Sequence, residues 1–371
     1  MKKILLFLTT LLPIAVQAQV ANGYYRIQNY GSTRYITITD DIVGGVNMAS
    51  TTADLSNITT WRGFDHVKSS PASVFYVEQV NSQYNMKCQG TSIYQIAGGK
   101  TYLDFIARDN NTYVLSVTYQ GTTARLFDTT KDIDEGYVTN KKPSDSNGHD
   151  QWSFLPITDG DNYIGLQPTV QIGNDWYGTV YASYPFKLAS SGITVYIVDG
   201  AKDSMFQLLE ITDEVKPATT PLLFKCSSND PAQNKVLPVT DATTPPDNNM
   251  LAGTFFASTV NKHEKYVKYD ENTMRVLGKN DAGELVFTKA TTDYLSEKKY
   301  IPMNTCYLNL ASGASGDYKL VDRGTYTGIR SIEANTNAAA AKATYTLTGV
   351  RVDNPTTPGI YIRDGKKVVI K

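Results

Sequence analysis

The sequence predicts an all-β protein, and three observations carry that prediction. Short runs rich in β-branched and aromatic residues recur along the chain, as in VFYVE (74–78), YVLSV (113–117) and TVYIV (194–198). Gly, Asn, Asp and Ser separate these runs, and turn residues between such segments are typical of antiparallel sheets. Tyr, which suits half-buried sheet faces, occurs 25 times. Long runs at helical spacing are missing, and the best helix candidate is the short Ala53–Trp61.

Length and charge narrow the class of protein further. A chain of 371 residues predicts two or three domains. Its formal net charge is -1, whereas nucleic acids and anionic membranes call for a basic surface. We therefore expect no nucleic-acid partner, and instead a glycan or protein ligand outside the cell.

The first 18 residues have the pattern of a signal peptide. Lys2 and Lys3 precede an apolar run from Ile4 to Val16, and Val16 and Ala18 occupy the small-residue positions of a cleavage site. The run is shorter than the about 20 residues that span a bilayer, so no transmembrane span is predicted. We expect a protein that is secreted or held on the outer cell surface.

Residues 22–157 contain a loose internal repeat. GYYRIQNYGSTRYITI, FYVEQVNSQYNMKCQGTSIYQI and YVLSVTYQGTTARLFD each read as strand, turn and strand, and the stretch closes on DQWSF. This pattern resembles the β-trefoil of the ricin-type lectins, with a long insertion (DDIVGGVNMASTTADLSNITTWRGFDHVKSS) placed in the middle unit. The family's Gln-x-Trp motif is altered, because Gln151 and Trp152 are adjacent here, so no lectin residues are carried over.

Residues 162–322 form a second block. The phrases WYGTVY, YPFK, GITVYIVDG, NNMLAGTFFA and YIPMNTCYLNL follow one another in it. Their order resembles a β-sandwich-like module of secreted Bacteroidetes proteins. That resemblance implies a fold and no particular activity.

The end of the chain is separate again. Residues 323–343 read as an Asn- and Ala-rich linker, and residues 344–371 (TYTLTGVRVDNPTTPGIYIRDGKKVVIK) read as a small sheet with a hairpin at Asp364-Gly365. This tail is similar to the C-terminal sorting domain of type IX secretion. The resemblance implies the secretion machinery as a partner, while the alternative is a strand pair that completes the preceding domain.

No residue pattern predicts a catalytic centre, a cofactor or a metal site. The three His residues lie in different regions, and the motifs GxSxG and HExxH are absent from the sequence. Asp159-Gly160-Asp161 begins like a calcium loop without its later ligands. Cys88, Cys226 and Cys306 are expected to be buried thiols, with a Cys226–Cys306 disulfide left open.

Aromatic residues are the remaining candidates for a ligand site. Trp61, Trp176 and Tyr177 lie in polar, turn-rich segments and are our candidate ligand-binding residues, whereas Trp152 is expected in the core. The sequence thus predicts a non-enzymatic binding or adhesion protein, with carbohydrate as one candidate ligand and another protein as the other. Two alternatives stay open: a secreted glycoside hydrolase or peptidase with carboxylates from distant segments, and a structural subunit of a surface assembly.

Overall fold

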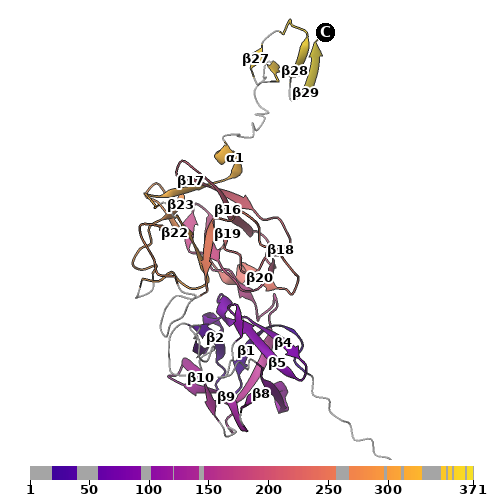
Figure 1. The fold of residues 1–371 in the computed structure, drawn as a ribbon, viewed down its shortest axis with the longest axis vertical. Helices are drawn as coiled ribbons and strands as arrows, with labels where there is room; N and C mark the ends of the chain where they lie inside the picture. The colour runs from indigo at the N-terminus through magenta and orange to yellow at the C-terminus, as the bar shows by residue number, and fades with distance from the viewer. Residues whose placement is uncertain are drawn as a thin grey trace, which may run out of the picture. The chain divides into compact units, whose positions relative to one another are not determined.

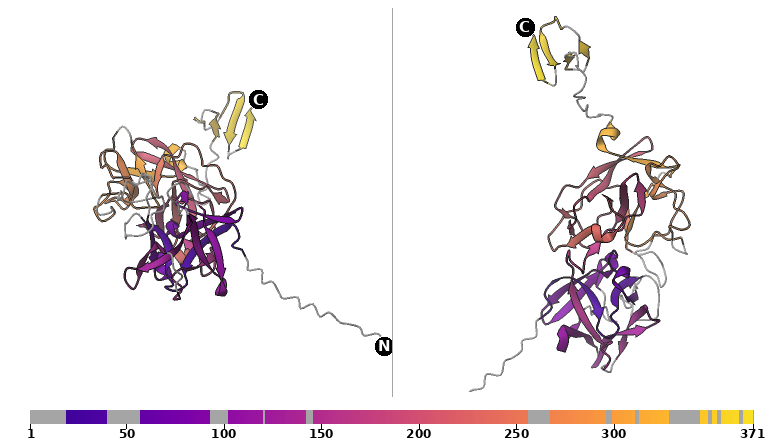
Figure 2. Two further views of the ribbon diagram at one scale, coloured as in Figure 1. Left: turned by 60° about the horizontal axis from the view of Figure 1, so that its bottom comes forward. Right: turned by 180° about the vertical axis from the view of Figure 1, so that it is seen from behind.

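The computed structural model describes residues 19–39, 57–92, 102–119, 121–141, 146–255, 267–295, 299–310, 313–327, 344–347, 350–352, 355–363 and 366–370. The expected signal peptide and most of the expected linker lie outside these residues. The described part is nearly all β, and its one α-helix is the short α1 (Arg323–Thr327), which confirms the predicted class. The chain divides into two compact units, Met1–Tyr326 and Thr327–Lys371 (Figures 1 and 2).

Six strands of the N-terminal module pair in a closed ring. They are β1 (Gly23–Asn29), β4 (Phe75–Val80), β5 (Gln83–Cys88), β7 (Asp104–Arg108), β8 (Thr112–Tyr119) and β11 (Gln151–Pro156). Antiparallel pairing joins β1 to β4, β4 to β5, β7 to β8, β8 to β11 and β11 back to β1. A bridge between Tyr84 and Leu103 closes the gap between β5 and β7. The first and last strands of the module are therefore neighbours, as a barrel requires.

Further strands form hairpins that extend this ring. β2 (Tyr35–Thr39), β3 (Asn57–Trp61), β10 (Glu135–Lys141) and β9 (Thr122–Thr130) are hydrogen-bonded in that order, and β6 (Thr91–Ser92) pairs with β5. A six-stranded barrel with added hairpins is the arrangement of a β-trefoil. The trefoil-like fold predicted for this part of the chain is confirmed.

The segment predicted as a helix is a strand where it is described. β3 pairs with β2 on one side and with β10 on the other, while residues 53–56 lie outside the described residues. Ile58, Thr59 and Thr60 are β-branched and fit a pleated sheet better than a helix. The expected insertion also lies between β2 and β4 rather than in the middle unit, and it contributes a strand of the fold.

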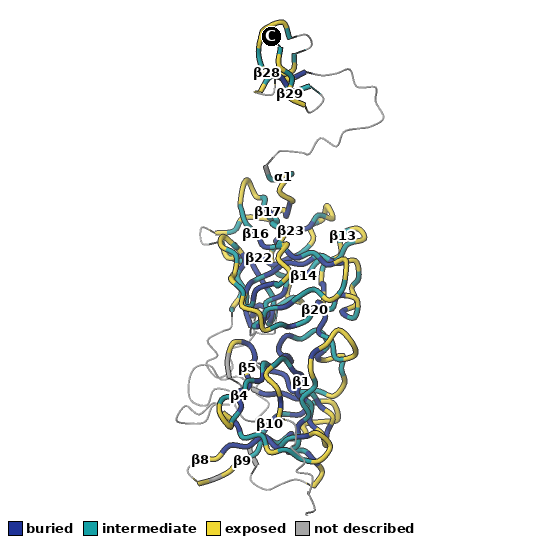
Figure 3. Tube along the Cα trace, turned by 90° about the vertical axis from the view of Figure 1, so that its right-hand side faces the viewer, coloured by how far each residue is buried: buried dark blue, intermediate teal, exposed yellow. Residues whose placement is uncertain are grey.

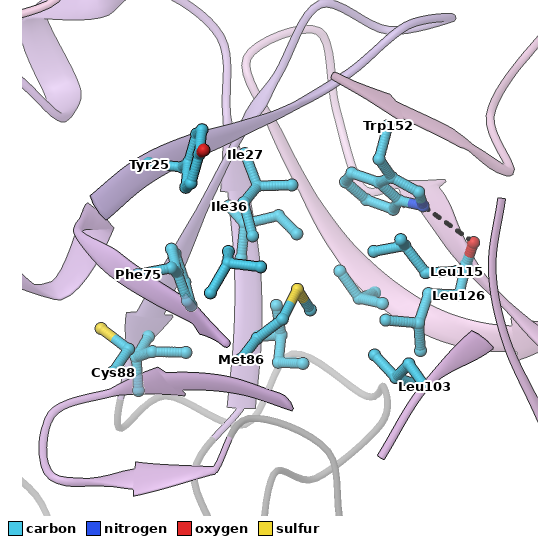
Figure 4. Close-up of a cluster of buried hydrophobic side chains, with 14 of the residues drawn as sticks. Tyr25, Ile27, Ile36, Phe75, Met86, Cys88, Leu103, Leu115, Leu126 and Trp152 are labelled. Atoms are coloured by element: carbon cyan, nitrogen blue, oxygen red, sulfur yellow. Dashed lines mark hydrogen bonds between the residues drawn. The ribbon is translucent and has the colours of Figure 1, made fainter. Parts of the chain in front are cut away.

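Trp152 lies in the core of the barrel, as predicted. Its side chain is fully buried, and its indole N–H donates to the carbonyl of Leu126 at 3.1 Å (Figure 4). The same apolar cluster contains side chains from along the whole module, including Ile27, Phe75 and Leu115. One buried Trp with its N–H satisfied thus joins the third repeat to the rest of the core.

The second module is built from two sheets. The smaller contains β12 (Ile164–Gly165), β20 (Lys235–Pro238), β15 (Phe186–Leu188) and β18 (Val215–Lys216) in that order. The larger runs β13 (Val170–Ile172), β14 (Asp175–Val180), β19 (Leu222–Cys226), β16 (Thr194–Lys202), β17 (Met205–Glu210), β25 (Tyr318–Val321), β23 (Leu285–Thr288), β22 (Met274–Lys279), β24 (Thr305–Asn309) and β21 (Leu251–Thr254).

Side chains alternate between two cores in this module. Val195 and Ile197 of β16 face the core shared with the smaller sheet, whereas Val198 faces a core enclosed by the larger sheet. The larger sheet curls back on itself: β14 and β24 are far apart in its strand order, yet the Cys306 N–H of β24 donates to the Thr179 hydroxyl of β14 at 3.1 Å. Figure 3 shows the buried segments in dark blue along the strands and the exposed residues in yellow at the turns. The result is the predicted sandwich-like layering with one strongly curved layer.

The two modules share part of a core. Phe255, which follows β21, is buried within the apolar cluster of the trefoil, and Tyr181 stacks on it with ring centroids 4.4 Å apart. Arg26 of β1 is fully buried and donates to the side chain of Asn162 at 2.7 Å. Apolar and polar contacts therefore both cross from one module to the other.

The second compact unit contains a four-stranded sheet. Its order is β27 (Arg351–Val352), β26 (Thr344–Thr346), β28 (Gly359–Arg363) and β29 (Lys366–Ile370). The register pairs Arg363 with Lys366, and Tyr361 of β28 is buried. The turn residues Asp364 and Gly365 lie outside the described residues. The expected small β tail is present as a unit of its own.

Candidate ligand-binding site

Trp176 and Tyr177, two of the three predicted ligand-binding residues, do not form one platform. They are neighbours on β14 and point to opposite faces of the sheet. Trp176 packs against the core next to the smaller sheet, and Tyr177 packs against the core inside the larger sheet. Both are half-buried, and much of each ring serves the fold.

Trp61, the third candidate, lies at the surface of the trefoil. It ends β3 and stacks on the imidazole of His66, with ring centroids 5.1 Å apart and ring planes 16° apart. His66 ends the short 3-10 helix η1 (Phe64–His66) and is exposed, while Trp61 is half-buried. Flat, partly exposed aromatic rings of this kind present apolar faces to a ligand.

The turn between β9 and β10 borders this stack. Glu135 of β10 pairs with Trp61, and the Arg62 N–H donates to the Asp134 carbonyl at 2.7 Å. Ile133 at the tip of the turn is 71% exposed. We call Trp61, Arg62, His66, Ile133 and Asp134 the Trp61 surface. It combines aromatic and apolar area with one cationic and one anionic side chain.

A buried ion pair connects the strand and the turn that carry the Trp61 surface. Arg34 and Asp128 lie 3.1 Å apart, and their side chains are 3% and 0% exposed. The other carboxylate oxygen of Asp128 accepts from the Thr60 hydroxyl at 2.6 Å, and Arg34 also donates to the Asp132 carbonyl at 2.8 Å. This network ties β3 to the turn on which the surface depends.

Asp132 gives the turn its shape. Its carboxylate accepts the backbone N–H groups of Asp134 at 2.9 Å and Glu135 at 2.8 Å. These hydrogen bonds, first that of Glu135 and then that of Asp134, hold the pKa of the Asp132 carboxyl below its ordinary value. A carboxylate that accepts hydrogen bonds from the backbone N–H groups of its own turn in this way fixes the backbone conformation around Ile133.

Sequence reasoning missed a second exposed aromatic residue, Tyr30. It is 48% exposed in the turn after β1, and its hydroxyl accepts a long hydrogen bond of 3.4 Å from the Asn110 amide. Asn110 lies in the turn between β7 and β8, next to a small hollow of about 120 Å³. The NYG sequence at 29–31 marks a turn, but only the fold brings Asn110 to it.

The cysteines are free and buried, so the disulfide left open between Cys226 and Cys306 is not formed. Burial raises the pKa of all three thiols, that of Cys306 to about 12. Such thiols are not activated nucleophiles.

In the Asp159–Asp161 turn, backbone carbonyl groups accept hydrogen bonds from the side chain of Lys235. Lys235 Nζ donates to the Asp159 carbonyl at 2.6 Å and to the Gly160 carbonyl at 3.3 Å. Across the described ranges, no group of three or more His, Cys, Asp or Glu could hold a metal ion. In the same ranges, no helix has the length and apolar character to cross a membrane.

Comparisons with known proteins give no family. No family model and no curated protein matches the chain. Among solved structures, the chain is similar to ThreeFoil, a designed three-fold symmetric protein, with 13% identity and a TM-score of 0.26 over 37% of this chain and all of that one. A Polyporus squamosus lectin bound to an influenza-binding epitope matches with 14% identity and a TM-score of 0.27 over 38% of this chain and 51% of that one. A proteinase inhibitor from Coprinopsis cinerea matches with 8% identity and a TM-score of 0.26 over 38% of this chain and 100% of that one.

Proposed function

We propose that the protein binds carbohydrate outside the cell through its trefoil module, at the Trp61 surface. The observation that carries this proposal is the partly exposed Trp61–His66 stack beside charged side chains. Sugar rings offer apolar C–H faces to aromatic rings and hydroxyl groups to charged or amide side chains. Arg62 and Asp134 supply donors and acceptors at the edge of the stack.

The support beneath this surface favours binding as its role. A buried ion pair and the closed Asp132 turn fix the backbone on either side of Trp61. A binding site gains affinity when its groups are held in place before the ligand arrives. We propose further that the chain is exported, as its first 18 residues indicate, and that its C-terminal unit directs delivery to the surface.

The test is a glycan array followed by calorimetry with the best-binding glycan. We expect Trp61→Ala to weaken binding about tenfold or more, equal to about 1.4 kcal/mol. Trp61→Phe keeps a ring and should retain part of the affinity. Tyr102→Ala removes another partly exposed ring, 38% exposed, from the same module and serves as the matched control.

Two outcomes contradict the proposal. One is an array on which the wild-type protein binds no glycan. The other is glycan binding that Trp61→Ala leaves unchanged in a variant with the wild-type melting temperature. Loss of binding in Trp176→Ala or Tyr30→Ala, with Trp61→Ala intact, would move the site to those residues.

A further inference from the structure

A cavity of about 300 Å³ lies in the second module, where residues 69–71 of the trefoil also contribute to its wall. Its apolar lining comes from both sheets and includes Ile164, Leu166, Val180, Phe186, Phe224 and Val236. No charged side chain lines it among the described residues. Protein interiors are close-packed and hold few voids larger than a water molecule, so a space of this size stands out.

One polar group in the wall of the cavity is the hydroxyl of Tyr184. Tyr184 lines the cavity and is only 2% exposed, and its hydroxyl makes no hydrogen bond within the described part of the chain. Two other polar side chains of the wall have partners. The Thr179 hydroxyl accepts from the Cys306 N–H at 3.1 Å, and the Thr305 hydroxyl donates to the Pro302 carbonyl at 2.6 Å. A single hydroxyl in a mainly apolar wall is a specific partner for one hydrogen-bonding group of a ligand.

The mouth of the cavity is polar. Gln167 and Thr169 belong to its lining and are exposed, which gives a small molecule a route from solvent. Gln167 donates to the Asn229 carbonyl at 3.0 Å, so its side chain is held at this edge. Pockets that are apolar inside, with a few placed polar groups, are the usual form of small-molecule sites.

We propose that this cavity binds a compact, uncharged, mainly apolar molecule that carries one hydrogen-bonding group, and that this group pairs with the Tyr184 hydroxyl. The volume suits a ligand larger than benzene, which fits an apolar cavity of about 150 Å³. No charged side chain in the described part of the chain lines the cavity to pair with an ionised group, and the buried Arg26 interacts with Tyr184 from outside the lining. Burial, its largest cause, raises the pKa of Tyr184, so the hydroxyl stays protonated and able to donate.

The probes are 2-phenylethanol and ethylbenzene, which share a ring and differ in the hydroxyl group. Both are titrated into the full mature chain and followed by calorimetry and by NMR. We expect both to bind. Tyr184→Phe should weaken 2-phenylethanol about five- to tenfold and leave ethylbenzene unchanged, because only the alcohol uses the hydroxyl. Ala182→Leu places added methyl groups at the cavity wall and should abolish binding of both probes.

Ala189→Leu makes the same change at an exposed position and is the matched control. Melting temperatures show whether each variant is folded, and Tyr184→Phe tests the site even if Ala182→Leu does not fold. The proposal is overturned if neither probe binds the wild-type protein, if a folded Ala182→Leu binds as before, or if Tyr184→Phe weakens both probes equally. Glycan binding at the Trp61 surface is a separate measurement, and we expect both cavity variants to retain it.

Discussion

Gln89 and Asn304 exchange two hydrogen bonds across 215 residues of sequence. Each side-chain amide donates to the carbonyl oxygen of the other at 2.9 Å. Gln89 also donates to the Phe255 carbonyl at 3.1 Å, and Asn304 donates to the Tyr181 carbonyl at 3.0 Å. Both amides are buried, so the junction between trefoil and second module contains a fully paired polar centre.

Asn304→Ala should be strongly destabilising. It leaves the buried amide of Gln89 without its partner, which costs about 1–3 kcal/mol. Asn304 also has φ 58°, a backbone conformation that Ala tolerates less well than Asn. Urea unfolding measures the loss, and Asn229→Ala in an exposed loop is the control. An Asn304→Ala protein as stable as the control would show that the pair contributes nothing.

Asp128→Asn should cost about 3–5 kcal/mol, because it leaves the buried guanidinium of Arg34 without its counter-ion. The matched change at the surface is Glu271→Gln, whose partner Lys289 lies 3.5 Å away in an exposed pair. There we expect less than about 1 kcal/mol. Chemical denaturation of both variants gives the comparison. Equal losses would contradict the role assigned to burial.

Acid should open the Asp132 turn. A carboxyl whose pKa is lowered on folding stabilises the folded turn above its unfolded pKa, and this contribution is lost as the pH falls through the folded pKa. The amide signals of Asp134 and Glu135 should therefore titrate together, below the ordinary aspartate range. Asp132→Asn should abolish that titration. A midpoint at or above the ordinary value in the wild-type protein would rule out the proposed hydrogen bonding.

Truncation after Tyr326 should leave the first compact unit intact. The second unit has its own sheet and its own buried residues, Thr344 and Tyr361, so the upstream cores lose none of theirs. The melting temperature and ligand binding of the truncated chain should match those of the full chain, while its delivery to the cell surface should change. Unfolding of the truncated protein, or unchanged delivery, would show that the tail is an ordinary structural strand pair.

Local patterns in the sequence predicted much of the fold. The period-two runs were sufficient for the all-β class, since they report directly on a buried sheet face, whereas the trefoil was implied by the resemblance to ricin-type lectins. The helix predicted at Ala53–Trp61 was wrong for a local reason, because Ile58, Thr59 and Thr60 are β-branched and favour a strand. Tertiary pairing with β2 and β10 decides that segment.

The candidate site was less accessible to sequence reasoning. Trp61 was named, but its partner His66, the Asp134 turn and the Arg34–Asp128 pair come from separate segments. Tyr184 lies just before β15, between the half-buried Ser183 and Pro185, and nothing local marks its hydroxyl as part of a cavity wall. Such features depend on contacts that only the folded chain creates.

The position of Phe255 bears on how such proteins can be recombined. A gene fragment that ends after the trefoil would encode a barrel whose apolar core lacks the ring of Phe255. A fragment that starts at the second module would carry that ring with Tyr181 stacked on it but without the trefoil residues that bury it. The unit that can be transplanted into another protein, by evolution or by cloning, is therefore the pair of modules together.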